Sequence, residues 1–130
     1  MREILFRGKR IDNGEWVEGD LVHSYFKVGD TCINASRENL GFYEVDPSTA
    51  GQYTGLCDKN GKKIFEGDIL SDVYGMHPTY AIIFNDFCAA FQFEYTDGYC
   101  EGFLESINHK HMEVIGTIHD NPELLEVSHE

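Results

Sequence analysis

Four histidines between residues 77 and 119 are the first residues whose type and spacing could support chemistry. They are His77, His109, His111 and His119. Two of them flank Lys110, and residues two apart in an extended chain point to the same side, where imidazole nitrogens can bind zinc or nickel. The spacing fixes no third ligand, and a solvated turn before the last strand explains the same residues. We therefore predict no metal site.

Cysteines could supply a nucleophile or a disulfide, and they occupy Cys32, Cys57, Cys88 and Cys100. Their spacing matches neither a CxxC redox pair nor the paired knuckles of a zinc site. Cys100 and His109 can be paired on paper, but no third group orients them as a nucleophile requires. We expect no signal peptide and a chain large enough to fold unaided, so we predict free thiols and no catalytic residue.

Two Glu-Gly-Asp units, Glu18-Gly19-Asp20 and Glu66-Gly67-Asp68, could supply paired carboxylates for acid–base catalysis or for magnesium. A structural role explains them better. Glycine lets a strand bend or another backbone approach closely, and the flanking aspartate can accept hydrogen bonds from nearby backbone amides. We therefore interpret Gly19, Asp20, Glu66, Gly67 and Asp68 as residues of a structural motif.

The segment Gln52-Tyr53-Thr54-Gly55 is the best candidate for a recognition surface. It places an amide, a phenol and a hydroxyl beside glycines, in what we interpret as a loop. Together with Asp58, the residues Gln52, Tyr53 and Thr54 form the predicted interaction surface. The alternative is that Tyr53 plugs one end of a barrel.

The first half of the chain has the pattern of short strands joined by turns. Residues 3–7 and 15–23 predict two strands joined by the turn Asp12-Asn13-Gly14, and short strands are expected at residues 31–33 and 42–45. From residue 46 to residue 63, closely spaced turn-forming residues predict a loop region that ends in a tight hairpin at Asn60-Gly61.

The second half contains the most hydrophobic segments, residues 79–85 and 88–95, which predict central strands. A final strand is expected at residues 112–118. Asn121 and Pro122 then suit the cap and first position of one helical turn. No segment shows a sustained 3.6-residue apolar period, so many short strands with glycine-rich turns predict a small barrel or sandwich.

Composition limits the classes of function. The chain has 130 residues and a net charge of −13, from 10 basic and 23 acidic residues. This charge disfavours direct binding to nucleic acid or to anionic lipid. No apolar run is long enough to span a membrane, so a cytosolic protein is the simplest expectation.

Segments in the middle of the chain closely resemble the YopX family of phage and prophage proteins, and the resemblance extends over almost the entire length. The segments are Gly51-Gln52-Tyr53-Thr54-Gly55-Leu56, Asp58-Lys59-Asn60-Gly61 and Phe65-Glu66-Gly67-Asp68-Ile69, with weaker marks at Gly116 and Asn121-Pro122-Glu123-Leu124. The resemblance implies a mainly β fold, an SH3-type β barrel with additional hairpins and one short C-terminal helical turn. It adds Gly55, Gly61, Asn121 and Pro122 to the structural motif, and it carries no established activity.

We expect a single domain, residues 1–130, with a barrel core at roughly residues 46–125 and an N-terminal hairpin region at residues 1–45. The leading hypothesis is a non-catalytic phage or prophage accessory protein in the cytoplasm of a bacterial host. It would need no cofactor and would act by contact with an unknown protein partner. An acidic DNA mimic that inhibits a nuclease or restriction enzyme, and a small-ligand-binding protein or enzyme that uses the Tyr53 loop, are the alternatives. Self-association into a homo-oligomer also stays open.

We expect the replacement Gly67→Val to lower the thermal midpoint of unfolding, because a β-branched side chain prevents the sharp bend or close backbone approach that the motif needs. Thermal unfolding followed by circular dichroism measures the effect. An unchanged midpoint would contradict the structural interpretation of the Glu-Gly-Asp unit.

Overall fold

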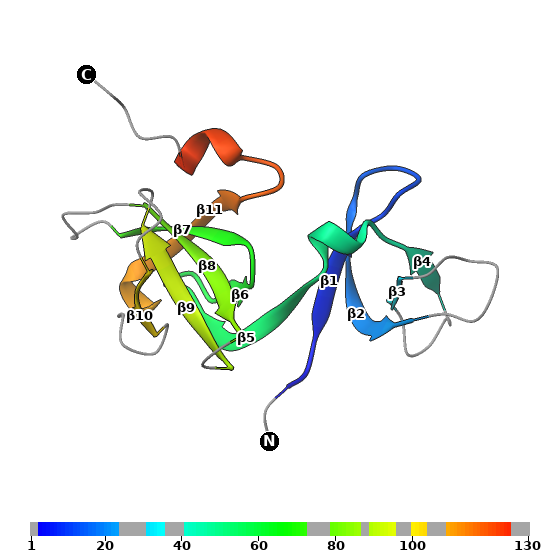
Figure 1. Ribbon diagram of the computed structural model, residues 1–130, viewed down its shortest axis with the longest axis horizontal. Helices are drawn as coiled ribbons and strands as arrows, with labels where there is room; N and C mark the ends of the chain where they lie inside the picture. The colour runs from blue at the N-terminus through cyan, green and yellow to red at the C-terminus, as the bar shows by residue number, and fades with distance from the viewer. Residues whose placement is uncertain are drawn as a thin grey trace. The chain divides into compact units, whose positions relative to one another are not determined.

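The computed structural model describes residues 3–23, 31–35, 41–72, 79–86, 89–95, 100–103 and 109–125. These residues form antiparallel strands joined by turns and short 3-10 segments (Figure 1). The predicted mainly β fold is therefore confirmed, whereas its assignment to the SH3 type stays a prediction. Among the described residues, no helix has the length and apolar character needed to cross a membrane.

The chain divides into two compact units, Met1–Tyr53 and Thr54–Glu130. Strand β5 (Gly51–Cys57) crosses the boundary, so that its first residues belong to one unit and its last residues to the other. The predicted division placed the N-terminal region at residues 1–45 and the barrel core at residues 46–125. That division stays a prediction; the boundary between the compact units lies inside β5, whose residues the sequence pattern had assigned to a loop.

The first unit begins with the predicted hairpin of β1 (Phe6–Lys9) and β2 (Trp16–Val22). Its antiparallel register sets Phe6 opposite Gly19 and Lys9 opposite Trp16. The turn is closed by the amide of Gly14, which donates to the carbonyl of Arg10 at 2.9 Å, and Gly14 has a φ of 72°. Positive φ is accessible to glycine at little cost, which is why the Asn-Gly pair predicts this turn correctly.

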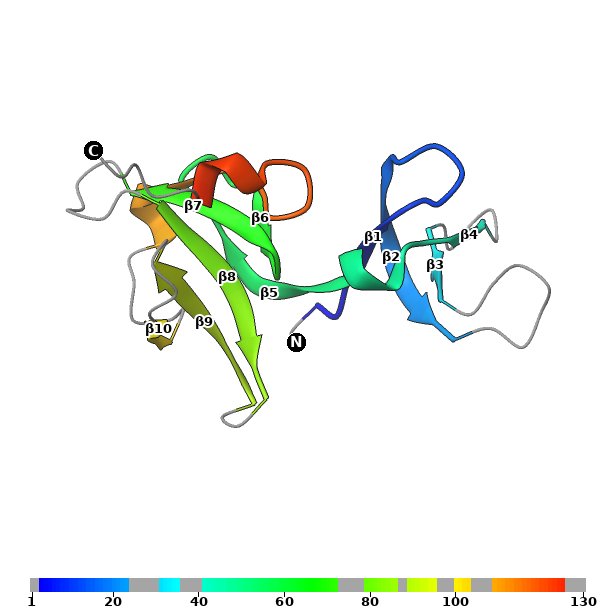
Figure 2. The ribbon, with the colours of Figure 1, turned by 45° about the horizontal axis from the view of Figure 1, so that its top comes forward.

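Strands β3 (Cys32–Asn34) and β4 (Phe42–Glu44) extend this sheet in the order β4-β3-β2-β1. After β4 the chain returns to the end of β1, where Val45 forms a bridge with Arg10 and the amide of Ile11 donates to the carbonyl of Glu44 at 3.1 Å. Both views show these strands curling around their own interior (Figure 2). Cys32, Ile33 and Val45 are the fully buried hydrophobic residues described in this unit.

The prediction of a loop from residue 46 to residue 63 was wrong over much of its length. A 3-10 turn, η1 (Pro47–Thr49), is followed by the seven residues of β5, which pair with β1 through Phe6 opposite Gln52 and Arg7 opposite Gly51. Gly55 adopts a φ of 92° within the strand, so this glycine distorts the strand and does not end it. A pairing partner more than 40 residues away overrides the local turn signal.

The end of that region forms the tight hairpin that the sequence predicted. It joins β5 to β6 (Lys63–Phe65). The amide of Asp58 donates to the carbonyl of Lys62 at 2.8 Å, and the amide of Gly61 donates to the carbonyl of Asp58 at 3.0 Å. Gly61 has a φ of 80°, which explains why a glycine stands at this position.

A second sheet in the Thr54–Glu130 unit has the order β10-β9-β8-β7-β11. Its strands are β7 (Asp68–Asp72), β8 (Thr79–Asn85), β9 (Ala90–Tyr95), β10 (Cys100–Phe103) and β11 (Met112–Thr117). The two most hydrophobic segments of the sequence form β8 and β9 in the interior of the sheet, as predicted. The strands bend around one side, as both views show (Figure 2).

One buried cluster forms the core of this unit. Tyr80 and Phe93 meet edge to face, with ring centroids 5.4 Å apart and an interplanar angle of 89°. Aromatic pairs in this geometry contribute about 0.5–1.5 kcal/mol beyond the burial of their area. The cluster comprises Ile64, Leu70, Tyr80, Ile82, Phe93 and Met112.

The chain ends in the described region with η4 (Pro122–Leu125), and Pro122 holds its first position as predicted. Asn121 was predicted to cap this turn, but its side-chain oxygen accepts instead from the amide of Thr117 at 3.2 Å. A Cβ added to Gly116 would lie 2.5 Å from that same oxygen. Gly116 therefore leaves the space that the Asn121 side chain occupies.

Close backbone approach also explains Gly19 in β2. A Cβ on this residue would overlap the carbonyl oxygen of Asn34 and lie 3.0 Å from the Cα of Ala35. Both atoms belong to backbone, which cannot rotate away as a flexible side chain can. Gly19 thus permits the end of β3 to lie directly against β2.

We expect Gly19→Ala to lower the free energy of unfolding by about 2–3 kcal/mol, because the new methyl group forces the two strands apart. Gly14→Asn is the matched control, since no atom lies within 4 Å of a Cβ there and asparagine tolerates positive φ. Urea unfolding of both variants measures the difference. Equal stabilities would show that the strands separate without cost.

Candidate functional site

Gly67, at the centre of the second Glu-Gly-Asp unit, uses its backbone to join separate strands. Its amide donates to the carbonyl of Ile82 in β8 at 2.7 Å, and its carbonyl accepts from the amide of Ile118 after β11 at 2.9 Å. Its φ of 92° lies in the region that favours glycine. These contacts support a structural role for the motif.

The carboxylate of Asp68 has no solvent-exposed surface, and its Oδ2 accepts from the amide of Phe65 at 2.7 Å. A carboxylate in this position closes the turn between β6 and β7 and cannot reach a substrate. Glu18 and Asp20, by contrast, are exposed on β2. The two Glu-Gly-Asp units therefore share a tripeptide, but the aspartate is buried in one and exposed in the other.

Asp58 was predicted to belong to an interaction surface, but the side chain is buried in the hairpin between β5 and β6, with 5% of the residue exposed. One oxygen accepts from the amides of Asn60 and Lys62, each at 2.9 Å, and the other accepts from the amide of Val114 in β11 at 2.9 Å. Burial alone raises the pKa of this carboxyl, but the three amide donors outweigh burial and hold the pKa below its usual value.

The other predicted interaction residues lie on β5 and not on a loop. Tyr53 is buried, and the hydroxyl of Thr54 donates to the carbonyl of Ile64 at 2.8 Å. Gln52 is half-buried. Because Tyr53 and Asp58 are withdrawn from solvent, we do not carry the interaction-surface hypothesis forward for these two residues, and the Tyr53 loop proposed for ligand binding is a strand.

The candidate metal and nucleophile residues are only partly described. His77 and Cys88 lie outside the described residues, and so do the side chains of Cys100 and His109. Cys32 is buried and Cys57 is half-buried. Within the described residues, no group of three or more His, Cys, Asp or Glu side chains could hold a metal ion.

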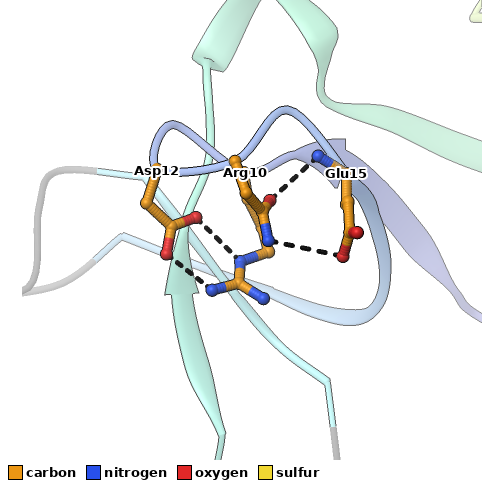
Figure 3. A network of polar contacts seen from close by, with 4 residues as sticks. Arg10, Asp12 and Glu15 are labelled. Atoms are coloured by element: carbon orange, nitrogen blue, oxygen red, sulfur yellow. Dashed lines mark hydrogen bonds and ion pairs between the residues drawn. The ribbon is translucent and has the colours of Figure 1, made fainter.

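The sequence analysis did not single out Arg10, which directly follows β1 and whose guanidinium is held by its neighbours. The Nε of Arg10 donates to Oδ1 of Asp12 at 2.9 Å, and its Nη2 donates to Oδ2 at 2.6 Å (Figure 3). The guanidinium carbon also lies 4.3 Å from the centre of the Tyr43 ring. The hydrogen bonds from Arg10 lower the pKa of the Asp12 carboxyl. A bidentate ion pair and an aromatic face therefore hold one guanidinium in place.

This arginine borders a cavity of about 250 Å³ in the first unit. Ile11 and Phe42 stand at the cavity with exposed fractions of 59% and 43%, although both side chains are large and apolar. In the sequence, the one indication of an exposed apolar surface here is Ile11, which directly precedes the polar turn Asp12-Asn13-Gly14. We call the lining residues the Arg10 cavity, and they are Arg10, Ile11, Asp12, Phe42, Tyr43 and Glu44.

Trp16, the single tryptophan, is engaged by cations of the neighbouring strand. The guanidinium carbon of Arg7 lies 4.5 Å from the ring centre and the Nζ of Lys9 lies 5.8 Å from it. Arg7 itself is 8% exposed. These contacts hold one face of the hairpin together and do not leave the indole as an open platform for a ligand.

Comparison with known proteins supports the family and the fold. The family profile described as YopX protein matches residues 5–126. Protein EF1440 from Enterococcus faecalis, known from a crystal structure, is similar with a TM-score of 0.63 and 27% sequence identity, over 97% of this chain and 100% of that chain. No curated protein matches the chain. The resemblance inferred from the sequence segments is thus confirmed, and no reaction or ligand comes with it.

We expect Asp58→Asn to lower the free energy of unfolding at pH 7 by about 2 kcal/mol, because the amide side chain replaces a charge-assisted acceptor with a donor at one of its contacts. The folded-state pKa is depressed, so the stabilisation is complete above the unfolded value near 3.9 and disappears as pH falls through the folded value. The stability gap between wild type and variant should therefore narrow below about pH 4.

Urea unfolding at a series of pH values measures this gap. Glu123→Gln, which changes an exposed carboxylate in η4, is the control and should keep wild-type stability at pH 7. A gap that stays constant into acid would mean that the charge of Asp58 does not stabilise the fold.

Proposed function

The chain belongs to the YopX family, and from this premise we propose that it is a non-catalytic accessory protein of a phage or prophage that acts in the bacterial cytoplasm by binding another protein. The observation that carries the proposal is the Arg10 cavity. Two large apolar side chains, Ile11 and Phe42, are exposed there beside a guanidinium that is already held in place. Exposed apolar groups around fixed polar groups are typical of contact surfaces between proteins.

The hydrogen bonds of two buried carboxylates argue in the same direction. The Asp58 side chain accepts hydrogen bonds from three backbone amides, and that of Asp68 accepts one in a position without solvent exposure. Carboxylates used in this way stabilise turns, whereas a general acid or base needs access to the reacting group. Binding therefore explains this chain better than catalysis.

Inhibition by DNA mimicry is the second candidate, and the distribution of charge favours it. The segment Thr54–Glu130 contains 14 acidic and four basic residues, so it carries a formal charge of −10 out of the −13 of the whole chain. A nuclease or restriction enzyme with a basic DNA-binding groove would be attracted by this segment. In this case the contact would be electrostatic and would not depend on the Arg10 cavity.

We expect the immobilised chain to retain a specific protein from bacterial lysate, and the double variant Ile11→Ser/Phe42→Ser to retain at least about tenfold less of it, because the apolar contact is lost. Mass spectrometry identifies the retained protein, which is then purified and titrated against both forms. Ile115→Ser, at an exposed apolar position of β11, is the matched control.

Salt separates the two candidates. Binding through the apolar contact should persist between about 50 and 200 mM salt, whereas DNA mimicry predicts steep loss over this range and displacement by duplex DNA. Retention that the double variant preserves and DNA abolishes would replace the first candidate with the second. A chain that retains no protein at either salt concentration would overturn both.

A further inference from the structure

We propose that the Arg10 cavity binds a short segment of a partner protein in which one bulky apolar side chain stands next to a lysine or arginine. The inference rests on the proposed function, because it names the chemistry of the partner at the same surface. Its basis is the size of the cavity, the charges at its edge and the rigidity of its base.

The size of the cavity suits one side chain. Its volume is about 250 Å³, below the range of roughly 300–1,000 Å³ that pockets for small ligands and cofactors occupy. The aromatic ring of Phe42 and the aliphatic side chain of Ile11 are exposed at this cavity. A leucine, methionine or phenylalanine of a partner would cover both and remove them from water.

The charges around the cavity favour a lysine or arginine next to the apolar side chain of the partner. Arg10 is the cation among its lining residues, and the bidentate contact with Asp12 compensates its charge. Glu44 also lines the cavity, and Glu15 lies close enough to raise the pKa of Arg10 through its charge. The charges of these described residues therefore sum to a negative value, and a lysine or arginine of the partner complements it.

The same electrostatics disfavour a second copy of this chain as the occupant. Each copy has a net charge of −13, so two copies repel each other, whereas a partner with a basic segment is attracted from a distance. Electrostatic attraction of this kind mainly raises the association rate, and the apolar contact then limits dissociation. In the proposed motif, the basic residue thus raises the association rate and the apolar residue slows dissociation.

Several hydrogen bonds hold the base of the cavity in the free chain. Besides its contacts with Asp12 and Tyr43, Arg10 donates its amide to the carbonyl of Glu15 at 2.8 Å, and the amide of Ile11 donates to the carbonyl of Glu44 at 3.1 Å. The contacts among Arg10, Asp12 and Glu15 hold the hairpin turn (Figure 3), and the bond from Ile11 to Glu44 ties the turn to the end of β4. A surface that is ordered before binding loses little conformational entropy when the partner docks.

The test is a selection of random 12-residue peptides displayed on phage against the purified chain, followed by titration of the selected peptides by fluorescence anisotropy. We expect the selected peptides to share a bulky apolar residue adjacent to lysine or arginine. Phe42→Ser should raise the Kd at least about tenfold through loss of the apolar contact, and Glu44→Lys should raise it mainly through slower association at low salt.

Two matched variants control for general effects. Ile115→Ser removes an exposed apolar side chain elsewhere, and Glu123→Lys reverses an exposed charge elsewhere, so both should leave the Kd unchanged. Circular dichroism melting of all four variants checks that they fold. Peptides without a basic residue, or a Kd that Phe42→Ser leaves unchanged, would overturn the inference.

Sedimentation of the free chain tests the competing occupant. A dimer that Phe42→Ser dissociates would identify a second copy at the cavity and overturn the proposed peptide motif. If the lysate experiment yields a partner that binds independently of Phe42, the inference fails while the proposed function stands. If no peptide and no protein binds, both fail.

Discussion

The arrangement of the Thr54–Glu130 unit depends on the hydrogen bonds that the carboxylate of Asp58 accepts. This carboxylate closes the hairpin between β5 and β6 through the amides of Asn60 and Lys62, and it reaches Val114, 56 residues further along the chain. The amide of Lys59 adds a second link by donating to the carbonyl of Met112 at 2.8 Å. The edge strand β11 is thereby tied to the hairpin, and backbone groups that would otherwise be left without acceptors are satisfied.

Glycines make the other long-range contacts possible, and they do so in different ways. Gly67 has a positive φ and joins β8 to the residues after β11 through its own amide and carbonyl. Gly19 occurs in the same Glu-Gly-Asp context, but the reason for its presence is the backbone of Asn34 lying against it. The same Glu-Gly-Asp tripeptide thus provides a positive φ at Gly67 and close packing of two strands at Gly19.

The two units differ in the surfaces they offer. The Thr54–Glu130 unit carries most of the negative charge of the chain, while the Met1–Tyr53 unit exposes Ile11 and Phe42 beside Arg10. Since Asp58 and Asp68 serve the fold, the groups available for function are those on the surface. In the proposed binding function, charge attracts a partner and apolar contact retains it.

The sequence by itself determined the family, the mainly β class, the first hairpin and the two central strands, because alternating apolar residues and Asn-Gly turns act locally. It could not place β5, since Gly51 and Gly55 resemble loop residues until β1 provides a pairing partner. Only the tertiary structure decided that Asp58 is buried, because the amide of Val114 is distant in sequence. It also created the Arg10 cavity, since Arg10 and Tyr43 meet only when β4 returns to the end of β1.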